Sequence, residues 1–197
     1  MDKTTLETTD KLALQYYNRY NNEQIMHKHR ERFIKFIEGI RILDIGCGTG
    51  RDCREFSNKG FDVTGIDASN EMLSYARREA PKVNFHNKNM EDILFDTRYN
   101  GVWICSSLYH INKEAAYNVL KSCYDGLFRG GLLFITIKEG IGQAFTGRKY
   151  FGKLKKFYAF YKSSEIITLV ERAGFDVFLL EKEYKDQTWI NVYARKK

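Results

Sequence analysis

The chain has 197 residues, 43% of them hydrophobic, and a formal net charge of +7. This length suits one domain with a sizeable core, and the hydrophobic content excludes a disordered chain. The sequence contains no apolar run near the roughly 20 residues that span a bilayer, and its first residues lack the basic-then-apolar pattern of a secretory signal. We therefore expect a cytoplasmic protein without a membrane segment, whose charge fits a solvated surface or an anionic partner.

The cysteine and histidine positions indicate no metal site. None of the cysteines forms a CxxC pair: they are Cys47, Cys53, Cys105 and Cys123. We expect free thiols, as is usual in a reducing compartment. His27 and His29 stand two residues apart, so a helix would point them in different directions. Both histidines are therefore expected at the surface.

Residues 4–38 have apolar and aromatic positions at helical spacing and predict two helices that end at Gly39. Strand-like runs and helical stretches then alternate. The strand-like runs are RILDI, FDVTGI, VNFHN, GVWICS and GLLFITI, and the helical stretches lie near 51–59, 69–80 and 112–127. Ser69 and Asn112 are expected N-caps. This alternation predicts βαβ units in a mostly parallel, doubly wound α/β sheet of the Rossmann-like type.

The C-terminal part predicts an antiparallel addition to this sheet. A last helix near 163–173 is followed by the runs FDVFLLE and WINVYARK. Two consecutive strands of this kind can pair as an antiparallel edge, because mixed sheets are common among such folds. We therefore expect one domain over residues 1–197, with no internal repeat.

Polar or special residues follow each predicted parallel strand. They are the glycine loop in ILDIGCGTGRD (42–52), Asp67, the pair Asn89 and Met90, CSSLYH (105–110) and KEG (138–140). Because the carboxyl ends of parallel strands meet at one edge of the sheet, we expect these segments to form one crevice.

The glycine loop and two acids indicate the ligand. Gly46 and Gly48 allow positive φ and close approach of a ligand to the backbone. Asp67 follows roughly 20 residues later, where a carboxylate can accept hydrogen bonds from ribose hydroxyls. Asp44, beside the loop, would repel a pyrophosphate and attract a cation. S-adenosylmethionine has a nucleoside, a sulfonium and an ammonium group but no phosphate, so these residues favour it over a dinucleotide.

Six segments in order resemble the class I S-adenosylmethionine-dependent methyltransferases over roughly residues 40–195. They are ILDIGCGTGRD, VTGIDAS, NMEDI, GVWICSSLYHI, GGLLFITIKEG and EIITLVERAGF. The similarity is strongest to small-molecule and ubiquinone-biosynthesis-type enzymes with an N-terminal helical cap. It implies a seven-stranded sheet whose last strand is antiparallel.

The same resemblance implies which residues bind the cofactor. They are Tyr16 and Tyr20 in an N-terminal aromatic element, Asp44, Gly46, Cys47 and Gly48 in the loop, Asp67 and Ala68 at the ribose and adenine, Asn89 and Met90 beside the adenine, and Cys105 and Ser106 under the methionine part. The family often has aspartate where Asn89 stands, and asparagine retains a carbonyl for the adenine amino group. We expect a helical cap over 1–39, a cofactor-binding core over 40–138, a lid over 139–162, and a C-terminal helix and strand pair over 163–197.

The sequence defines the residues that contact the methyl acceptor less clearly than those that bind the cofactor. A base is needed only if the nucleophile must lose a proton. His110, just past the fourth strand, is the candidate base, and a structural role as a helix cap or pocket wall is the alternative. Tyr109, Lys138 and Glu139 are expected to face the acceptor.

Residues 147–162, GRKYFGKLKKFYAFYK, are dense in basic and aromatic residues. Three interpretations stay open: a lid with solvated lysines, a pocket in which Arg148 holds an anionic small molecule, and an RNA-binding surface. We expect a mobile lid over 140–162, with Arg148 as the anchor of the acceptor and Lys155 and Lys156 pointing outward.

The predicted function is methyl transfer from S-adenosylmethionine to an oxygen or nitrogen of a small, anionic acceptor. An RNA methyltransferase acting on a modified tRNA base is the alternative. A nicotinamide-dependent reductase and a cofactor-binding protein without catalysis are further candidates. The sequence indicates neither the acceptor nor the oligomeric state.

Overall fold

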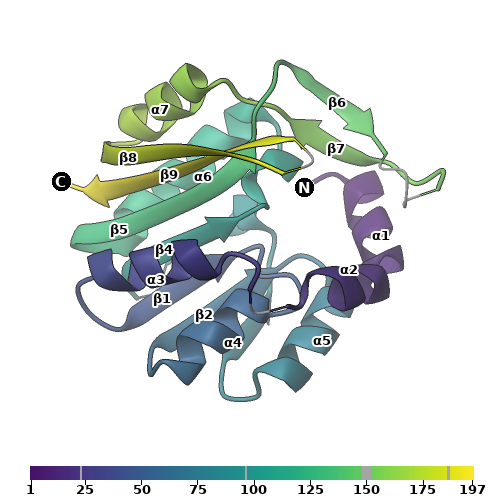
Figure 1. The fold of residues 1–197 in the computed structure, drawn as a ribbon, viewed down its shortest axis with the longest axis horizontal. Helices are drawn as coiled ribbons and strands as arrows, with labels where there is room; N and C mark the ends of the chain where they lie inside the picture. Colours follow the sequence, from purple (N-terminus) through teal and green to yellow (C-terminus); the bar gives the residue numbers. More distant parts are fainter. Residues whose placement is uncertain (23, 96, 148–151, 186) are drawn as a thin grey trace.

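The computed structural model describes residues 1–22, 24–95, 97–147, 152–185 and 187–197. Within these residues, a seven-stranded sheet has the order β3-β2-β1-β4-β5-β9-β8 (Figure 1). Its strands are β1 (Arg41–Ile45), β2 (Asp62–Asp67), β3 (Asn84–Asn87), β4 (Tyr99–Cys105), β5 (Leu127–Lys138), β8 (Phe175–Tyr184) and β9 (Thr188–Lys196). β9 pairs antiparallel with β5 and β8, and the remaining pairs are parallel. This confirms the predicted fold, including the antiparallel last strand.

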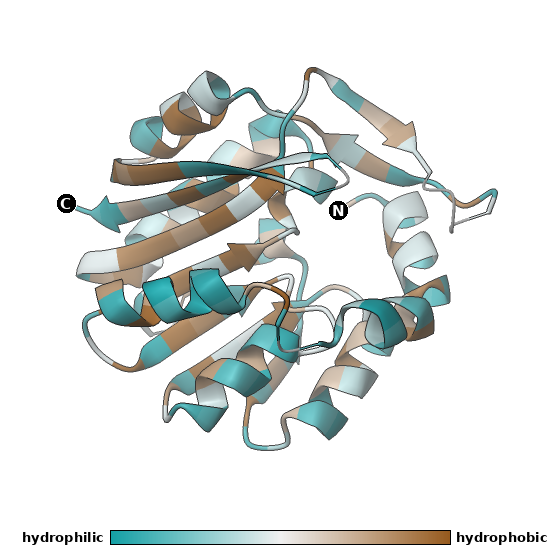
Figure 2. Ribbon diagram, viewed as in Figure 1, coloured by the Kyte–Doolittle hydropathy of each residue, from teal (hydrophilic) through white to brown (hydrophobic). Residues whose placement is uncertain are grey.

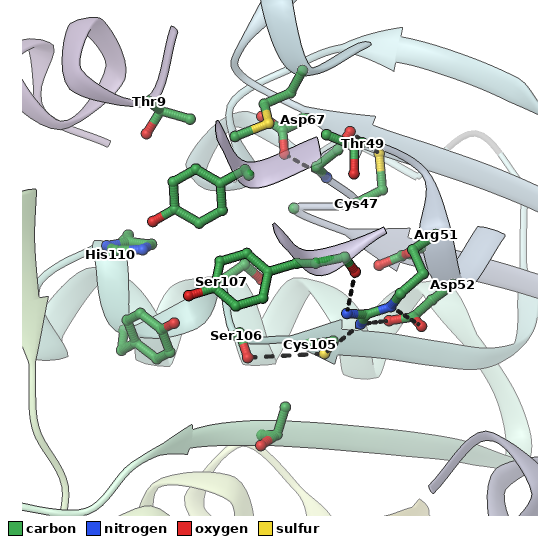
Figure 3. Close-up of a pocket in the computed structure, with 18 of the residues that line it drawn as sticks. Thr9, Cys47, Thr49, Arg51, Asp52, Asp67, Cys105, Ser106, Ser107 and His110 are labelled. Carbon is green, nitrogen blue, oxygen red and sulfur yellow. Dashed lines mark hydrogen bonds and ion pairs between the residues drawn. The ribbon is translucent and has the colours of Figure 1, made fainter. Parts of the chain in front are cut away.

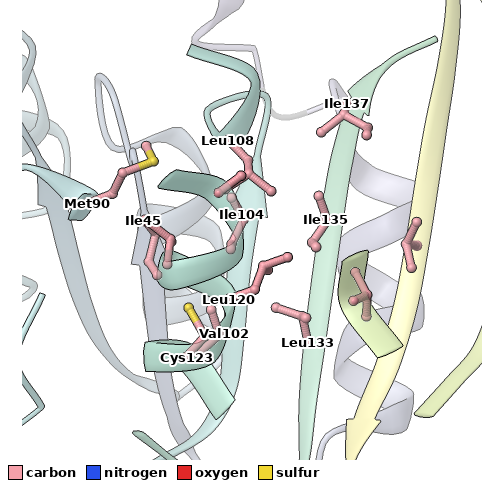
Figure 4. Close-up of a cluster of buried hydrophobic side chains, with 14 of the residues drawn as sticks. Ile45, Met90, Val102, Ile104, Leu108, Leu120, Cys123, Leu133, Ile135 and Ile137 are labelled. Atoms are coloured by element: carbon pink, nitrogen blue, oxygen red, sulfur yellow. The ribbon is translucent and has the colours of Figure 1, made fainter. Parts of the chain in front are cut away.

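Alternation along the strands sends neighbouring side chains into two cores, because the side chains of a strand alternate between the faces of the sheet. Ile42 packs in a cluster with Phe56 and Trp103, and Leu43 packs in a second cluster. The first cluster lies under α3 (His27–Phe36), α4 (Arg51–Asn58) and α5 (Asn70–Glu79), and the second under α6 (Lys113–Gly126) and α7 (Ser163–Arg172). Figure 4 shows the second cluster, and Figure 2 shows apolar strands inside more polar helices.

The order of the strands reverses between β1 and β4, which is where ligands bind in open α/β sheets. The helices α5 and α6, which follow β2 and β4, begin as expected. The side chain of Ser69 accepts a hydrogen bond from the Met72 amide, and that of Asn112 from the Ala115 amide. Both predicted N-caps are confirmed.

The N-terminal region has three helices, so the prediction of two over residues 4–38 was wrong. They are α1 (Lys3–Lys11), α2 (Ala13–Tyr20) and α3. Leu12, with φ −100° and ψ 2°, leaves the helical conformation between α1 and α2. Met26 has the left-handed φ of 66° just before α3. Two helices allow one break, and the chain has two. The break at Leu12 lies within the apolar and aromatic run from Leu6 to Tyr20, so this spacing did not reveal it.

Residues 143–159 contain a separate strand pair, β6 (Gln143–Thr146) with β7 (Lys156–Ala159), beside α1 (Figure 1). Two hydrogen bonds join β7 to α1. The Phe157 amide donates to Thr5 Oγ1 at 2.9 Å, and Thr8 Oγ1 donates to the Lys155 carbonyl at 2.9 Å. The two lysines face opposite ways: Lys155, just before β7, is exposed, but Lys156, its first residue, is 3% exposed. The expectation that both lysines point outward was wrong for Lys156.

His29 is also buried, contrary to expectation, whereas His27 on the same helix is exposed. The His29 ring, on α3, contacts one side chain of β8 and one of β9. Its Nδ1 is 2.8 Å from the Tyr193 hydroxyl and its Nε2 is 3.1 Å from Glu183. Among the described helices, none is both long and apolar enough to cross a membrane.

Candidate functional site

A pocket of about 460 Å³ opens at the carboxyl ends of the central strands, under the N-terminal helices. Most of the residues predicted for the site line it: Tyr16, Tyr20, Asp44, Gly46, Cys47, Gly48, Asp67, Ala68, Asn89, Met90, Cys105, Ser106, Tyr109 and His110. Lys138 and Glu139 do not line it, and Arg148 lies outside the residues that the structure describes. Figure 3 shows the convergence of the loop, the β2 acid and the segment after β4.

The glycine loop needs glycine at two positions for different reasons. Gly46 has φ +73°, and a Cβ there would lie 2.3 Å from Cβ of Ser107. Gly48 has φ +55°, but no atom lies within 4 Å of where its Cβ would be. Gly46 is therefore closed in by the protein, while Gly48 faces open space in the pocket, where a ligand can approach its backbone.

Asp67 holds the loop and the next helix together. Its Oδ2 accepts a hydrogen bond from the Gly48 amide and its Oδ1 accepts one from the Ser69 amide, both at 2.9 Å. Burial raises the pKa of Asp67 above 3.8, although these two amides favour its anion. The carboxylate is thus fixed at the edge of the pocket, where its remaining lone pairs can accept hydrogen bonds.

Asp44, at the carboxyl end of β1, is a second acid on the pocket wall and is 2% exposed. Its Oδ2 accepts a hydrogen bond from the Cys53 thiol at 3.2 Å, while Oδ1 has no hydrogen-bond partner among the described residues. Burial, and next the charge of Asp52, raise the pKa of Asp44 well above 3.8. A buried carboxyl with a partnerless oxygen is the complement of a cationic ligand group.

Arg51 and Asp52 form an ion pair behind Asp44. Arg51 Nη2 donates to Asp52 Oδ2 at 2.7 Å, and its guanidinium also bonds the Tyr20 carbonyl and Cys105 Sγ (Figure 3). Although burial opposes ionisation, Arg51 lowers the pKa of Asp52 to about 2. Asp52 therefore remains ionised. Its negative charge makes ionisation of Asp44 unfavourable as long as no cationic ligand is bound.

The segment after β4 holds a strained residue. Ser106 has φ +60°, a left-handed conformation that costs a non-glycine residue about 1–3 kcal/mol. Its amide donates to the Thr136 carbonyl at 3.1 Å, which keeps the chain close to β5. Strain of this kind is characteristic of ligand-binding sites.

His110 ends the short helix η2 (Leu108–His110) and is held in one orientation. Its Nδ1 lies 2.8 Å from the Phe157 carbonyl of β7. A carbonyl only accepts, so Nδ1 carries the hydrogen, and Nε2 is the basic nitrogen of the neutral ring. The ring centroid is 4.6 Å from that of Tyr109 and 4.8 Å from that of Tyr158.

Lys138 and Glu139 were expected to face the acceptor, but the structure turns both away from the pocket. The Lys138 ammonium, 4% exposed, lies 3.9 Å from the Tyr158 ring centroid, 5.3 Å from that of Tyr109 and 5.8 Å from that of Trp189. Glu139 forms an ion pair with Lys182 on β8. Lys138 supports the aromatic wall from behind by cation–π contacts.

Comparisons with known proteins agree with this geometry. A family model described as a methyltransferase domain matches residues 42–131. The chain is 34% identical over 127 residues to YqeM of Bacillus subtilis, covering 59% of this chain and 51% of that one. It is 26% identical over 126 residues to the ubiquinone biosynthesis O-methyltransferase of Rickettsia felis, covering 56% and 52%. The chain thus spans about half the length of these relatives.

A solved structure from Burkholderia thailandensis superposes with a TM-score of 0.70 at 20% identity, covering 97% of this chain and 88% of that one. It is a 1,6-didemethyltoxoflavin-N1-methyltransferase with bound 1,6-didemethyltoxoflavin and S-adenosylhomocysteine. The chain is thus similar to methyltransferases in sequence over residues 42–131, and to S-adenosylmethionine-dependent methyltransferases in fold.

Several residues that line the pocket were not predicted. They are Thr9, Arg19, Arg51, Asp52, Ser107, Thr136, Lys156, Glu183, Lys185, Trp189 and Asn191. Arg51 and Asp52 stand inside the glycine motif and could have been found there. The residues from β5, β7, β8 and β9 reach the pocket through strand pairing, for which a single sequence gives no signal.

Proposed function

We propose that this protein is a methyltransferase that moves the methyl group of S-adenosylmethionine to an oxygen or nitrogen of a small molecule. The observation that carries the proposal is that two acids, the buried Asp44 and the half-buried Asp67, line one pocket. This charge opposes a pyrophosphate and suits a cationic nucleoside. It therefore argues against a nicotinamide dinucleotide.

The residues present fit that cofactor. Asp67 has lone pairs for the ribose hydroxyls, the partnerless oxygen of Asp44 suits an ammonium group, and the Gly48 backbone borders open space. Asn89 lies on the pocket wall, on the side proposed for the adenine. S-adenosylmethionine supplies an electrophilic methyl group when bound. The chain supplies position and exclusion of water, which account for much of the rate of such transfers.

His110 is the proposed base. The Phe157 carbonyl fixes the hydrogen on Nδ1, so Nε2 can accept the proton of an acceptor hydroxyl or amine. Replacing His110 by Gln should lower methyl transfer about 10²- to 10⁴-fold, the usual contribution of a general base. Cofactor affinity should stay unchanged in this variant. If His110→Gln and the wild type transferred the methyl group at equal rates, His110 would have only a structural role.

Two features support a small acceptor. The relatives with named substrates, in ubiquinone and toxoflavin chemistry, act on small molecules. In addition, Lys138 and Lys156 are buried, so they are not available to an extended phosphate backbone. A cytoplasmic location is part of this proposal.

The test has two parts. Calorimetry measures S-adenosylhomocysteine binding to the purified chain, and labelled S-adenosylmethionine is then incubated with fractionated metabolites, RNA and protein. We expect binding, and label in the metabolite fraction. Label confined to RNA would replace the small acceptor with a nucleic acid, and absence of binding would refute the methyltransferase proposal.

A further inference from the structure

Asn191, in the antiparallel strand β9, is a buried amide on the wall of the pocket. Its side chain is 1% exposed, and its Nδ2 has no hydrogen-bond partner among the described residues. The carboxylate opposite it in the sheet, Glu181 on β8, pairs with Arg32 and Lys28 instead. Because most buried donors in native proteins are satisfied, this amide calls for an explanation.

Strand pairing places Asn191 in a polar row across the sheet. In the register of β4, β5 and β9, Cys105 is opposite Thr136, and Thr136 is opposite Asn191. Residues that are opposite each other in a sheet point to the same face. All three residues line the pocket, so these strands give it a polar floor.

The adjacent row on the same face is the aromatic core. It consists of Trp103, Phe134 and Tyr193, which are opposite one another in the same register and buried. Tyr193 follows Asn191 by two residues and therefore points to the same face of the sheet. The amide of Asn191 thus lies at the boundary where the core ends and the pocket begins.

Asn191 stands on the side of the pocket away from the proposed cofactor contacts. Asp44 and Asp67 belong to β1 and β2, whereas the strand order runs from β1 through β4 and β5 to β9. Neighbouring strands lie about 4.8 Å apart, so three steps across the sheet separate Asn191 from β1 by about 14 Å. The amide is therefore placed to contact the acceptor.

An aromatic wall connects this part of β9 with the proposed base. Trp189 precedes Asn191 by two residues, shares its face of the strand and lines the pocket. The ring centroid of Tyr109 is 6.0 Å from that of Trp189 and 4.6 Å from that of His110. A planar ring is the shape that packs best against such a wall, because aromatic rings prefer stacked or edge-to-face contacts.

We propose that Asn191 determines the specificity of the acceptor site: its Nδ2 donates a hydrogen bond to a carbonyl oxygen or ring nitrogen of a planar acceptor that packs against Trp189. The terminal torsion of asparagine is roughly two-fold, so a half-turn brings either edge of the amide to the pocket. An acceptor without such a group leaves the donor unpaired and binds less well. This rests on the proposed function for the identity of the bound molecule as the acceptor. A structural role and a contact with the cofactor are the competing explanations.

The test uses neutral matched probes, because the acceptor is unidentified. Aromatic ketones with a phenol hydroxyl are each paired with the analogue in which a methylene group replaces the carbonyl, such as para-hydroxyacetophenone with para-ethylphenol. Ligand-observed NMR measures their binding to the chain with and without S-adenosylhomocysteine. Asn191→Leu keeps the size of the side chain and removes the donor, and Asn191→Val removes it with a residue favoured in strands. Asn84→Leu, at an exposed position of β3, is the control.

We expect the wild type and Asn84→Leu to bind each ketone roughly 3- to 10-fold better than its partner, the scale of one hydrogen bond between neutral groups. Asn191→Leu and Asn191→Val should lose this preference and keep their affinity for S-adenosylhomocysteine. Asn191→Leu should also unfold at no lower temperature than the wild type, because it removes a buried donor without a partner.

Equal binding of the ketones and their partners by the wild type, or binding of neither at saturating concentration, would overturn the proposal. A preference that persists in either Asn191 variant would also overturn it and leave the residue a structural role. Loss of S-adenosylhomocysteine affinity in a folded Asn191→Val variant would assign the residue to the cofactor instead. If the wild type binds no S-adenosylhomocysteine, the methyltransferase proposal fails, while the ketone preference of the free chain still decides this one.

Discussion

The carboxylate of Asp67 and the amide of Gly48 are joined by a hydrogen bond of 2.9 Å, so the acid of β2 fixes the loop that follows β1. Asp67→Ala removes this bond together with the proposed ribose contacts. We expect S-adenosylhomocysteine binding to weaken by about 1.5–3 kcal/mol, as measured by calorimetry. Asp62→Ala, at the exposed start of the same strand, is the control. Equal affinities of the two variants for S-adenosylhomocysteine would show that Asp67 does not contact the cofactor.

Gly48→Val tests whether the open space at the loop is the ligand site. Gly48 and Gly60 both have left-handed φ and no atom within 4 Å of a new Cβ, but only Gly48 lines the pocket. Valine at either position should cost about 1–3 kcal/mol of stability from backbone strain. Only Gly48→Val should also lose cofactor binding. Binding retained by a folded Gly48→Val variant would place the cofactor elsewhere.

Asp44 predicts a linkage between pH and cofactor binding. Burial raises its pKa well above 3.8, so the carboxyl is neutral below that raised pKa and ionises above it. In the unliganded chain, ionisation of Asp44 therefore lowers stability as pH rises through the raised pKa. An ammonium group favours the ionised form, so affinity for S-adenosylmethionine should increase over the same interval.

Asp44→Asn should abolish this pH dependence. The variant should unfold at a higher temperature than the wild type at alkaline pH, yet bind S-adenosylmethionine about 1.5–3 kcal/mol more weakly. Thermal unfolding and calorimetry across a pH series check both effects. A wild-type affinity that is flat with pH would contradict the assignment of Asp44 to the ammonium group.

His29 predicts acid sensitivity of the contact between α3 and the C-terminal strands. Burial lowers its pKa below 6.5, although Glu183 favours the protonated ring. Because the unfolded chain takes up this proton more readily, stability should be lost as pH falls below 6.5 towards the lowered pKa. His29→Gln should flatten thermal stability in this interval, and His27→Gln, on the exposed side, should not. An unchanged slope in His29→Gln would show that other groups govern it.

The sequence allowed the sheet and the cofactor side of the pocket to be predicted, because both depend on local pattern. Neighbours such as Ile42 and Leu43 alternate between cores, and strand ends in a parallel sheet must converge, so Asp44 and Asp67 could be placed together. The acceptor side depends on long-range pairing. Lys155 and Lys156 look alike in sequence, and only the pairing of β7 with β6 and α1 decides which one turns inward.

The same reason explains the errors at His29 and Lys138. Each residue type is usually exposed, and each is buried here by contacts with residues far along the chain. His29 meets Tyr193 on β9, and Lys138 meets Trp189, its partner in the β5–β9 register. Neither contact has a local signature, so the sequence predicted a surface position for His29 and an acceptor-facing one for Lys138.

The buried pair of Arg30 and Asp52 restricts how this sequence can diverge. Arg30 Nη1 lies 2.5 Å from Asp52 Oδ1, Trp103 Nε1 donates to the same carboxylate at 3.0 Å, and both charged residues are at most 4% exposed. Losing Asp52 alone would leave the Arg30 and Arg51 guanidinium groups without this carboxylate, at a cost of about 3–5 kcal/mol. Homologues should therefore keep Arg30 and Asp52 together or replace them together by apolar residues. A lineage that replaces both residues by apolar ones must first acquire a substitution that compensates for the loss of one charge. The pair therefore limits divergence of the sequence, although neither residue is proposed to contact the substrate.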